Sequence, residues 1–171
     1  MRTQMHRVSF FPLVLIFLFL WIINESPAQV LHLSVDKMTQ KSEIIVTGKV
    51  VDKVCEWNQE KDKILTRVTV QVDQIHKGKG LAESLVVTHL GGEIGEVGEY
   101  YSGTPRFNED EEVFLFLRKD GKGSLRVVGS NQGKYTITRD VETGNRIIMN
   151  HKTLDAFSSQ IREIVARQKL E

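Results

Sequence analysis

The chain has 171 residues, with 23 Lys and Arg against 22 Asp and Glu, which gives a formal net charge of +1 at pH 7. Nucleic-acid affinity rests mainly on clustered Lys and Arg. This balanced sequence shows no such cluster, so we expect no nucleic-acid partner. The length fits one domain once a targeting segment is set aside. It also allows a core that needs no disulfide, in agreement with a single cysteine, Cys55.

The first 28 residues have the features of a secretory signal peptide. A charged start, an apolar run of 16 residues and two small residues follow one another as Arg2, His6 and Arg7, then Val8–Ile23, then Ser26 and Ala28. This order predicts cleavage before Gln29. An uncleaved anchor is the alternative, although spanning a bilayer takes roughly 20 apolar residues. We therefore expect an exported protein, periplasmic or extracellular, that meets the membrane only transiently through this segment.

Cleavage would leave residues 29–171 as a single domain. The segment before it contains two Arg and one Glu, so the remaining chain carries 21 basic and 21 acidic residues and is neutral. Cys55 is the lone cysteine of this domain. Its neighbours Val54 and Trp57 favour burial at a strand end over an intermolecular link.

Strands with a period of two dominate the first half of this domain. After a short helix predicted within Val30–Lys41, apolar and polar residues alternate in Ile44–Val54 and again in Ile64–Ile75. Gly48 offers no side chain to pack and indicates a bend or bulge in the first strand. A polar break at Asn58–Asp62 joins the two strands, so they predict an antiparallel hairpin with one solvent-exposed face.

Shorter strands follow, separated by turns. We expect them at Leu85–Leu90, Val113–Leu117, Leu125–Val128, Tyr135–Thr138 and Arg146–Met149. Val113–Leu117 is apolar at every position, which predicts a central strand covered on both faces. The last two segments are predicted to form a hairpin around residues 142–145.

An amphipathic helix is predicted at Thr153–Lys169, with Thr153 as N-cap and Asp155 favourable in the first turn. Its apolar stripe consists of Leu154, Phe157, Ile161, Ile164 and Val165. We expect this stripe to pack on the sheet rather than on a partner.

These segments predict a mainly β fold, a small antiparallel Greek-key barrel of the OB type with a short N-terminal helix and a C-terminal amphipathic α-helix. Seven strand candidates at close spacing, with turn signals between them, indicate a small barrel or a sandwich. The long first strands and the terminal helix favour the barrel. A fold class does not by itself give a function.

The connection Gly91–Phe107 is long for a small domain, and long loops are often functional. Its glycines suggest a phosphate cradle, but no Lys-Ser or Lys-Thr pair follows, and Glu93, Glu96 and Glu99 would repel an anion. The same glutamates are hard oxygen ligands for calcium, yet their spacing matches no known calcium loop. The histidines and Cys55 are not spaced as zinc ligands. We expect no cofactor and no metal.

Charged and aromatic residues in this loop are predicted to contact a partner, because Tyr, Phe and Arg anchor many interfaces. The predicted contact residues are Glu93, Tyr100, Tyr101, Arg106 and Phe107. The alternative is that the aromatic side chains fold back onto the sheet and hold the loop down. Both interpretations stay open.

The sequence favours a non-enzymatic binding module for an extracytoplasmic protein or glycan. No Gly-x-Ser-x-Gly elbow occurs and no Cys–His pair is indicated, so no catalytic residue is predicted. One alternative is an envelope hydrolase that uses His89 and a loop carboxylate. Another is a structural subunit that docks through the C-terminal helix.

Short motifs run along most of Ser42–Lys134. They are Ser42-x-x-Ile45-Val46-x-Gly48-x-Val50, Thr66-x-Val68-x-Val70, Lys77-Gly78, Gly91-Gly92, Gly103-x-Pro105-x-Phe107, Glu112–Leu117, and Val127-Val128-Gly129 before Gln132-Gly133-Lys134. This pattern resembles a family of small, largely uncharacterised exported bacterial proteins. The resemblance implies a barrel similar to the fold of tissue inhibitors of metalloproteinases and netrin modules.

The resemblance also implies a protease-binding or other extracellular interaction module. Those inhibitors use a disulfide-fixed N-terminal Cys that chelates the zinc of the protease. Here the predicted mature chain begins at Gln29 and contains one cysteine. The inhibitor mechanism therefore does not carry over, and the resemblance implies the fold alone.

Overall fold

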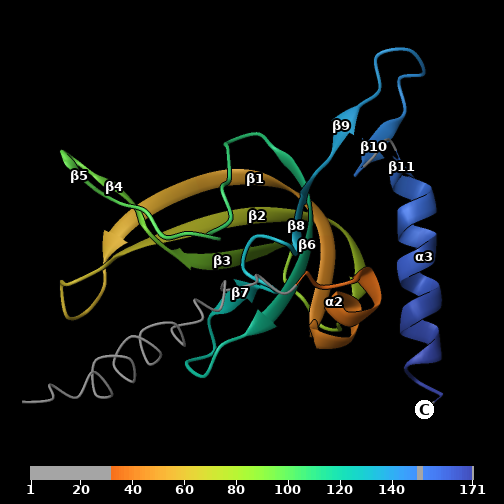
Figure 1. The fold of residues 1–171 in the computed structure, drawn as a ribbon, viewed down its shortest axis with the longest axis horizontal. Coiled ribbons are helices and arrows are strands. Elements are labelled where there is room, and N and C mark those ends of the chain that lie inside the picture. The colour runs from red at the N-terminus through yellow and green to blue at the C-terminus, as the bar shows by residue number, and fades with distance from the viewer. Residues whose placement is uncertain (1–31, 150–151, 171) are drawn as a thin grey trace, which may run out of the picture. The chain divides into compact units, whose positions relative to one another are not determined.

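The computed structural model describes residues 32–149 and 152–170 (Figure 1). The predicted signal peptide and its cleavage site before Gln29 lie outside the described residues. Within the described part, no helix is long and apolar enough to cross a membrane. This part of the chain is mainly β with two helices, which agrees with the predicted fold class at that level.

The helices and strands follow in one continuous order. They are α2 (Val35–Lys41), β1 (Ile44–Trp57), β2 (Ile64–Lys77), β3 (Ser84–Leu90), β4 (Gly92–Ile94), β5 (Val97–Glu99), β6 (Glu112–Lys119), β7 (Leu125–Val127), β8 (Lys134–Thr136), β9 (Thr138–Arg139), β10 (Arg146–Ile148), β11 (Lys152–Thr153) and α3 (Leu154–Arg167). The long first hairpin, β1–β2, matches the prediction from alternation.

The main sheet has six strands in the order β1-β2-β3-β7-β6-β8, and β1 also pairs with β6, so the sheet is partly closed on itself. Its pairings are antiparallel except for β3 with β7, which is parallel. β10 pairs with β9 and β11 in a separate small sheet, and β4 pairs with β5. Figure 1 shows the β4–β5 hairpin at one end of the β1–β2 hairpin and α3 at the other.

β1 reaches two partner strands because it bends at Gly48. Residues 44–49 pair with β6 on one side, and residues 45–49 of the same stretch pair with β2 on the other. The register with β2 shifts between Thr47 and Gly48, as at a β-bulge. A Cβ atom at position 48 would lie 2.3 Å from the carbonyl oxygen of Gln71, so the approach of the two backbones requires glycine. The predicted bend at Gly48 is confirmed.

A further register shift, between Val50 and Asp52, changes which residues of β1 point inward. The alternation of apolar residues in Ile44–Val54 predicts Val54 on the same buried face as Val50, but 47% of Val54 is exposed, so that prediction is wrong. A slip of one residue moves every following side chain to the opposite face of a strand. Lys53 and Cys55 take the inward direction instead.

β6 is buried on both faces, as its uniformly apolar sequence predicts. Val113, Leu115 and Leu117 belong to an inner cluster, whose other members are Ile44, Val46, Val50, Val68, Val70, Leu85, Val87, Phe107 and Val127. Phe114 and Phe116 belong to a helix-side cluster, whose other members are Leu33, Met38, Ile45, Val128, Ile137, Ile148, Leu154, Phe157, Ile161 and Ile164. One strand thus separates two cores.

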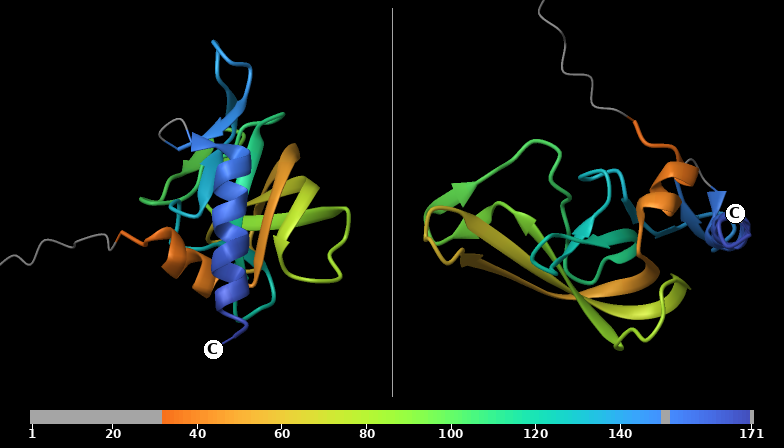
Figure 2. Two further views of the ribbon diagram at one scale, coloured as in Figure 1. Left: turned by 90° about the vertical axis from the view of Figure 1, so that its right-hand side faces the viewer. Right: turned by 90° about the horizontal axis from the view of Figure 1, so that it is seen from below.

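Both helices cover the helix-side cluster, and Figure 2 shows them next to each other on one flank of the sheet. The Thr153 hydroxyl accepts a hydrogen bond from the Ala156 backbone N–H, and Asp155 lies in the first turn, as predicted. Phe157 packs edge-on against Phe114, with ring centroids 4.9 Å apart. The apolar stripe of α3 is therefore used within the chain.

The predicted hairpin between Tyr135 and Arg146 forms differently. β8 leaves it and pairs with β6, placing Tyr135 opposite Phe114, while β9 supplies the partner of β10. The aromatic ring explains the choice, because Tyr135 packs against Phe116 with ring centroids 5.9 Å apart. Arg146 then holds β10 near the main sheet through ion pairs with Asp73 and Glu112.

His76 is a half-buried histidine at the end of β2 next to this aromatic core. Its ring stacks on Phe114 with centroids 4.7 Å apart. Burial, together with the positive charge of Arg162, lowers the pKa of His76 from 6.5 to about 4, against an opposing contribution from Asp73. The folded protein therefore holds this ring neutral at a pH where the unfolded chain protonates it.

We predict that the free energy of unfolding falls as the pH is lowered from about 6.5 to about 4, because the unfolded chain binds the His76 proton first. Urea unfolding across this range should show a smaller pH dependence in His76→Gln than in the wild type. A residual slope is expected from His89, whose pKa burial also lowers. His32→Gln, at an exposed position, is the matched control. An unchanged slope in His76→Gln would contradict this explanation.

Candidate functional site

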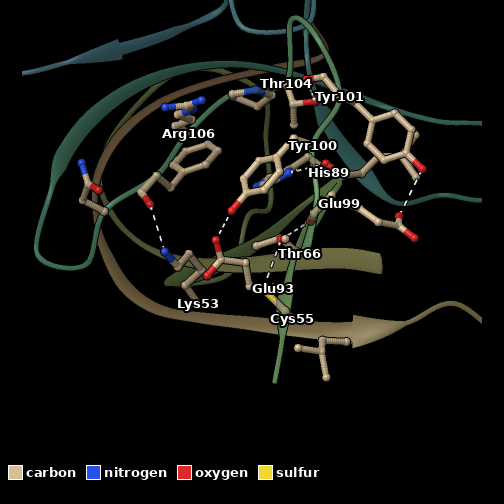
Figure 3. Close-up of a pocket in the computed structure, with 17 residues that line it drawn as sticks. Lys53, Cys55, Thr66, His89, Glu93, Glu99, Tyr100, Tyr101, Thr104 and Arg106 are labelled. Atoms are coloured by element: carbon tan, nitrogen blue, oxygen red, sulfur yellow. Dashed lines mark hydrogen bonds between the residues drawn. The ribbon is translucent and has the colours of Figure 1, made fainter. Parts of the chain in front are cut away.

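An open cavity of about 810 Å³ lies between the outer ends of β1, β2 and β3 and the segment 91–108 that follows β3 (Figure 3). All five predicted contact residues line it, together with residues that the sequence did not single out. The full lining is Lys53, Cys55, Thr66, His89, Leu90, Gly91, Gly92, Glu93, Ile94, Glu99, Tyr100, Tyr101, Thr104, Pro105, Arg106, Phe107 and Asn108. The long connection and the sheet thus form one concave surface.

The floor of the cavity is a row of three side chains across neighbouring strands. Cys55 of β1 lies opposite Thr66 of β2, which lies opposite His89 of β3. Directly opposed residues in antiparallel strands point to the same face. The Cys55 sulfur and the Thr66 hydroxyl oxygen are 3.4 Å apart, and the Thr66 hydroxyl donates to the carbonyl oxygen of Gly91. Thr66 is thus hydrogen-bonded both to its neighbour on β1 and to the connection above it.

Two glycines let the connection approach this floor. Gly91 has φ +87° and donates its N–H to the carbonyl oxygen of Ile64 at 2.8 Å. A Cβ on Gly92 would lie 2.5 Å from the Thr66 hydroxyl oxygen and 2.7 Å from the Cys55 sulfur. The glycine pair is therefore needed for close packing rather than for binding an anion.

Beyond these glycines the connection forms a short hairpin, where the sequence predicts only a loop. Ile94 pairs with Val97 across a two-residue turn, Gly95–Glu96, and Gly95 has φ +59°. Two-residue turns that begin with a left-handed glycine are a common hairpin connection. That turn between two β-branched residues was the signal that could have revealed β4 and β5.

The two tyrosines are held by carboxylates while remaining open to solvent. The Tyr100 hydroxyl donates to Glu93, and the Tyr101 hydroxyl donates to Glu99 at 3.1 Å. The exposed fractions are 71% for Tyr100 and 40% for Tyr101. Partial burial and the hydrogen bond to Glu99 raise the pKa of Tyr101, which keeps it a neutral donor. Glu99 also accepts the Ile64 N–H at 2.9 Å and so secures the hairpin.

Phe107 does not behave as a contact residue. Only 4% of it is exposed, and it belongs to the inner cluster. Its ring stacks on His89 with centroids 6.0 Å apart, and the Lys134 ammonium lies 5.4 Å from the ring centroid. For this residue the fold-back interpretation holds, since Phe107 ties the connection to the sheet.

A buried ion pair supports the end of the connection beneath Phe107. Glu111 pairs with the Lys134 ammonium and also accepts from the Thr136 hydroxyl and from the Asn108 N–H. Burial acts to raise the pKa of Glu111, but these hydrogen bonds outweigh it and hold the pKa below its usual value. Removal of either charged partner would leave a buried charge unpaired, which is costly.

The two cationic side chains on the cavity wall differ in their hydrogen bonding. Lys53 donates to the carbonyl oxygen of Phe107 at 3.4 Å. Arg106 is exposed, and its guanidinium makes no hydrogen bond or ion pair with any described residue. Figure 3 shows Arg106 on the loop side of the cavity and Lys53 on the strand side. Arg106 is therefore available to a ligand.

His89 lacks the environment of a general base. Its Nδ1 donates to the carbonyl oxygen of Leu90 at 2.9 Å, and none of the described carboxylates hydrogen-bonds to its ring. Burial lowers the pKa of His89; the Leu90 hydrogen bond opposes this shift, while Arg126 and Lys53 add to it. The charges that act on this ring are cationic, whereas the proposed hydrolase needs a carboxylate beside it.

Cys55, Thr66 and Lys53 were not predicted as site residues. All three lie on the outer half of β1–β2, and the register shift in β1 determines which of its side chains face the cavity. Within residues 32–149 and 152–170, no three His, Cys, Asp or Glu side chains come together as a metal site. Comparisons with known protein families and with curated proteins find no match for this chain.

We predict that truncating one aromatic residue of the cavity destabilises the fold strongly, whereas truncating another leaves its stability almost unchanged. Phe107→Ala should lower the free energy of unfolding by about 3 kcal/mol, because it empties part of the inner cluster. Tyr100→Ala, at an exposed position, should change it by no more than about 0.5 kcal/mol. Equilibrium urea unfolding measures both. A stable Phe107→Ala variant would contradict its assignment to the core.

Proposed function

We propose that this chain is an exported, non-enzymatic binding module that holds part of an extracytoplasmic protein or glycan in the cavity beneath Gly91–Phe107. The observation that carries the proposal is that an exposed Tyr100 ring and an unpaired Arg106 line the same concave surface. Ligand sites are typically concave, with a few polar groups that fix orientation. Exposed Tyr and Arg side chains also supply much of the energy at contact sites.

The fold side of the proposal is an OB-like Greek-key barrel. Strands β1, β2, β3, β7 and β6 follow one another as hydrogen-bonded neighbours and return to β1, with β3 and β7 parallel. In OB folds, the face of the second and third strands and the adjoining loops bind oligonucleotides and oligosaccharides. Thr66 on β2 and His89 on β3 line the cavity here. The neutral predicted domain favours a ligand other than nucleic acid.

The resemblance to the fold of tissue inhibitors of metalloproteinases and netrin modules supports the barrel, and the role itself is argued from the cavity. The hydrolase alternative loses support because His89 hydrogen-bonds to a backbone carbonyl oxygen. Docking through the C-terminal helix loses support because Phe157 and Ile161 are buried within the chain. Binding in the cavity uses groups that the fold leaves free.

A capture experiment tests the proposal. The full chain, immobilised, is exposed to a solubilised envelope fraction and to a glycan array, alongside Tyr100→Ala. We expect the variant to retain less than about a tenth of the bound material, because a contact residue of this type contributes 2 kcal/mol or more. Val141→Ala, in the fully exposed turn between β9 and β10, is the matched control and should bind like the wild type.

Two results would count against the proposal. One is full binding by Tyr100→Ala and also by a variant that lacks residues 95–104. The other is the absence of any captured protein or glycan that distinguishes the wild type from Tyr100→Ala. Urea unfolding of each variant separates lost binding from lost folding.

Export is proposed on the sequence of the first 28 residues alone. We predict that protein recovered from the extracytoplasmic fraction begins at Gln29, which intact-mass measurement and N-terminal sequencing determine directly. Replacing two apolar residues of the segment, as in Leu15→Arg with Leu18→Arg, should leave the chain in the cytoplasm. A membrane-bound chain with an intact N-terminus would instead favour the anchor.

A further inference from the structure

The charged side chains of the cavity differ in whether they already have a hydrogen-bond partner. Its two carboxylates each accept a tyrosine hydroxyl, and Glu99 accepts the Ile64 N–H as well. Among the cavity-lining residues, all of which lie in the described part of the chain, Arg106 is the charged residue without a hydrogen bond or ion pair. An exposed guanidinium presents a rigid fork that matches a carboxylate in two parallel hydrogen bonds.

The same cavity is also lined by an aromatic ring whose face is free, that of Tyr100. Only the hydroxyl of Tyr100 is engaged, by Glu93, and 71% of the residue stays exposed. That hydrogen bond fixes the ring orientation, which lowers the entropy lost when a ligand packs on it. In Figure 3, Tyr100 reaches from the loop side of the cavity toward Glu93, while Arg106 stays on the loop side.

We propose that the cavity binds a sugar that carries one carboxylate, with the carboxylate on Arg106, the sugar ring on Tyr100 and hydroxyl groups donating toward Glu93. This inference rests on the proposed function. The C–H face of a pyranose ring is apolar and packs on an aromatic ring, while its hydroxyls need polar partners. A free carboxylate oxygen of Glu93 supplies one such acceptor, because the Tyr100 hydroxyl uses only the other.

The glutamates limit how much negative charge the ligand can carry. Glu93 and Glu99 line the cavity and would repel a ligand that is anionic along its whole length. A single carboxylate at the Arg106 end, with neutral hydroxyl donors elsewhere, avoids that repulsion. The repulsion by these glutamates that argues against phosphate binding at the glycines therefore also favours a ligand with a single negative charge.

The cavity floor favours a sugar over an extended peptide. Peptide strands bind by pairing their backbone with a free sheet edge. At Cys55, Thr66 and His89 the backbones of β1, β2 and β3 already pair with one another. At Thr66, in the middle of this row, the backbone of β2 is paired on both sides, so the floor there offers side-chain groups, which recognise hydroxyls and carboxylates.

The test compares three probes on the uniformly ¹⁵N-labelled full chain by NMR titration. They are methyl β-D-glucuronide, methyl β-D-glucoside, which has the same ring without the carboxylate, and the peptide Gly-Asp-Gly. We expect the glucuronide to shift the amide signals of Tyr100, Arg106 and Glu93, and to bind at least about tenfold more tightly than the glucoside. Added NaCl should weaken the glucuronide alone, since salt screens exposed charge pairs.

Two variants identify the residue that reads the carboxylate. Arg106→Gln should lower glucuronide affinity about tenfold or more and leave glucoside affinity unchanged. Arg118→Gln is the matched control, because Arg118 is likewise exposed, lies outside the cavity and makes no side-chain hydrogen bond or ion pair with any described residue. Its removal changes the net charge equally and should not change either affinity.

Each other outcome overturns the inference. Equal binding of both sugars, unaffected by Arg106→Gln, would show a cavity that takes sugars without reading a carboxylate. Binding of Gly-Asp-Gly alone would assign the cavity to a peptide. No shift with any probe would exclude this ligand class, whereas the proposed binding module would still stand if Tyr100→Ala abolished capture. If no probe bound and Tyr100→Ala also captured as much material as the wild type, the proposed function would be contradicted as well.

Discussion

The close approach of β1 to β2 at Gly48 is the constraint on which the rest of the domain depends. With no Cβ at this position, β1 can lie against the Gln71 carbonyl and bend between two partner strands. Its first half then pairs with β6, which carries one core on each face. Its second half continues along β2 and brings Lys53 and Cys55 to the cavity. Sheet closure thus follows from the bend at Gly48, and the register shift between Val50 and Asp52 then turns the two cavity residues inward.

This arrangement separates the part of the domain that provides stability from the part that offers contact groups. The helices, the aromatic cluster and β6 occupy one end, and the hairpin β4–β5 with its tyrosines occupies the other (Figure 1). At the boundary, Phe107 and the Glu111–Lys134 pair fix the connection to the sheet. Tyr100 and Arg106 can therefore stay exposed without loosening the fold.

Periodicity in the sequence was enough to find the long strands, the two-faced burial of β6 and the cap of α3. Periodicity failed where a β-bulge sets the direction of a side chain, or where packing between distant residues sets the partner of a strand. Val54 turned outward because a bulge lies before it, and Tyr135 chose β6 because aromatic neighbours lie there. The loop was recognised as a site candidate from its residue types. Residue type alone could not separate Phe107, which is core, from Tyr100, which is exposed.

The most direct test of this account is the stability of Gly48→Ala measured by urea unfolding, with Gly121→Ala as the matched control. A Cβ at position 48 meets backbone at 2.3 Å, whereas one at position 121 meets nothing within 4 Å. We expect Gly48→Ala to lose about 2 kcal/mol or more and Gly121→Ala to stay within about 0.5 kcal/mol of the wild type. Equal stability of the two variants would contradict the central role of the bend.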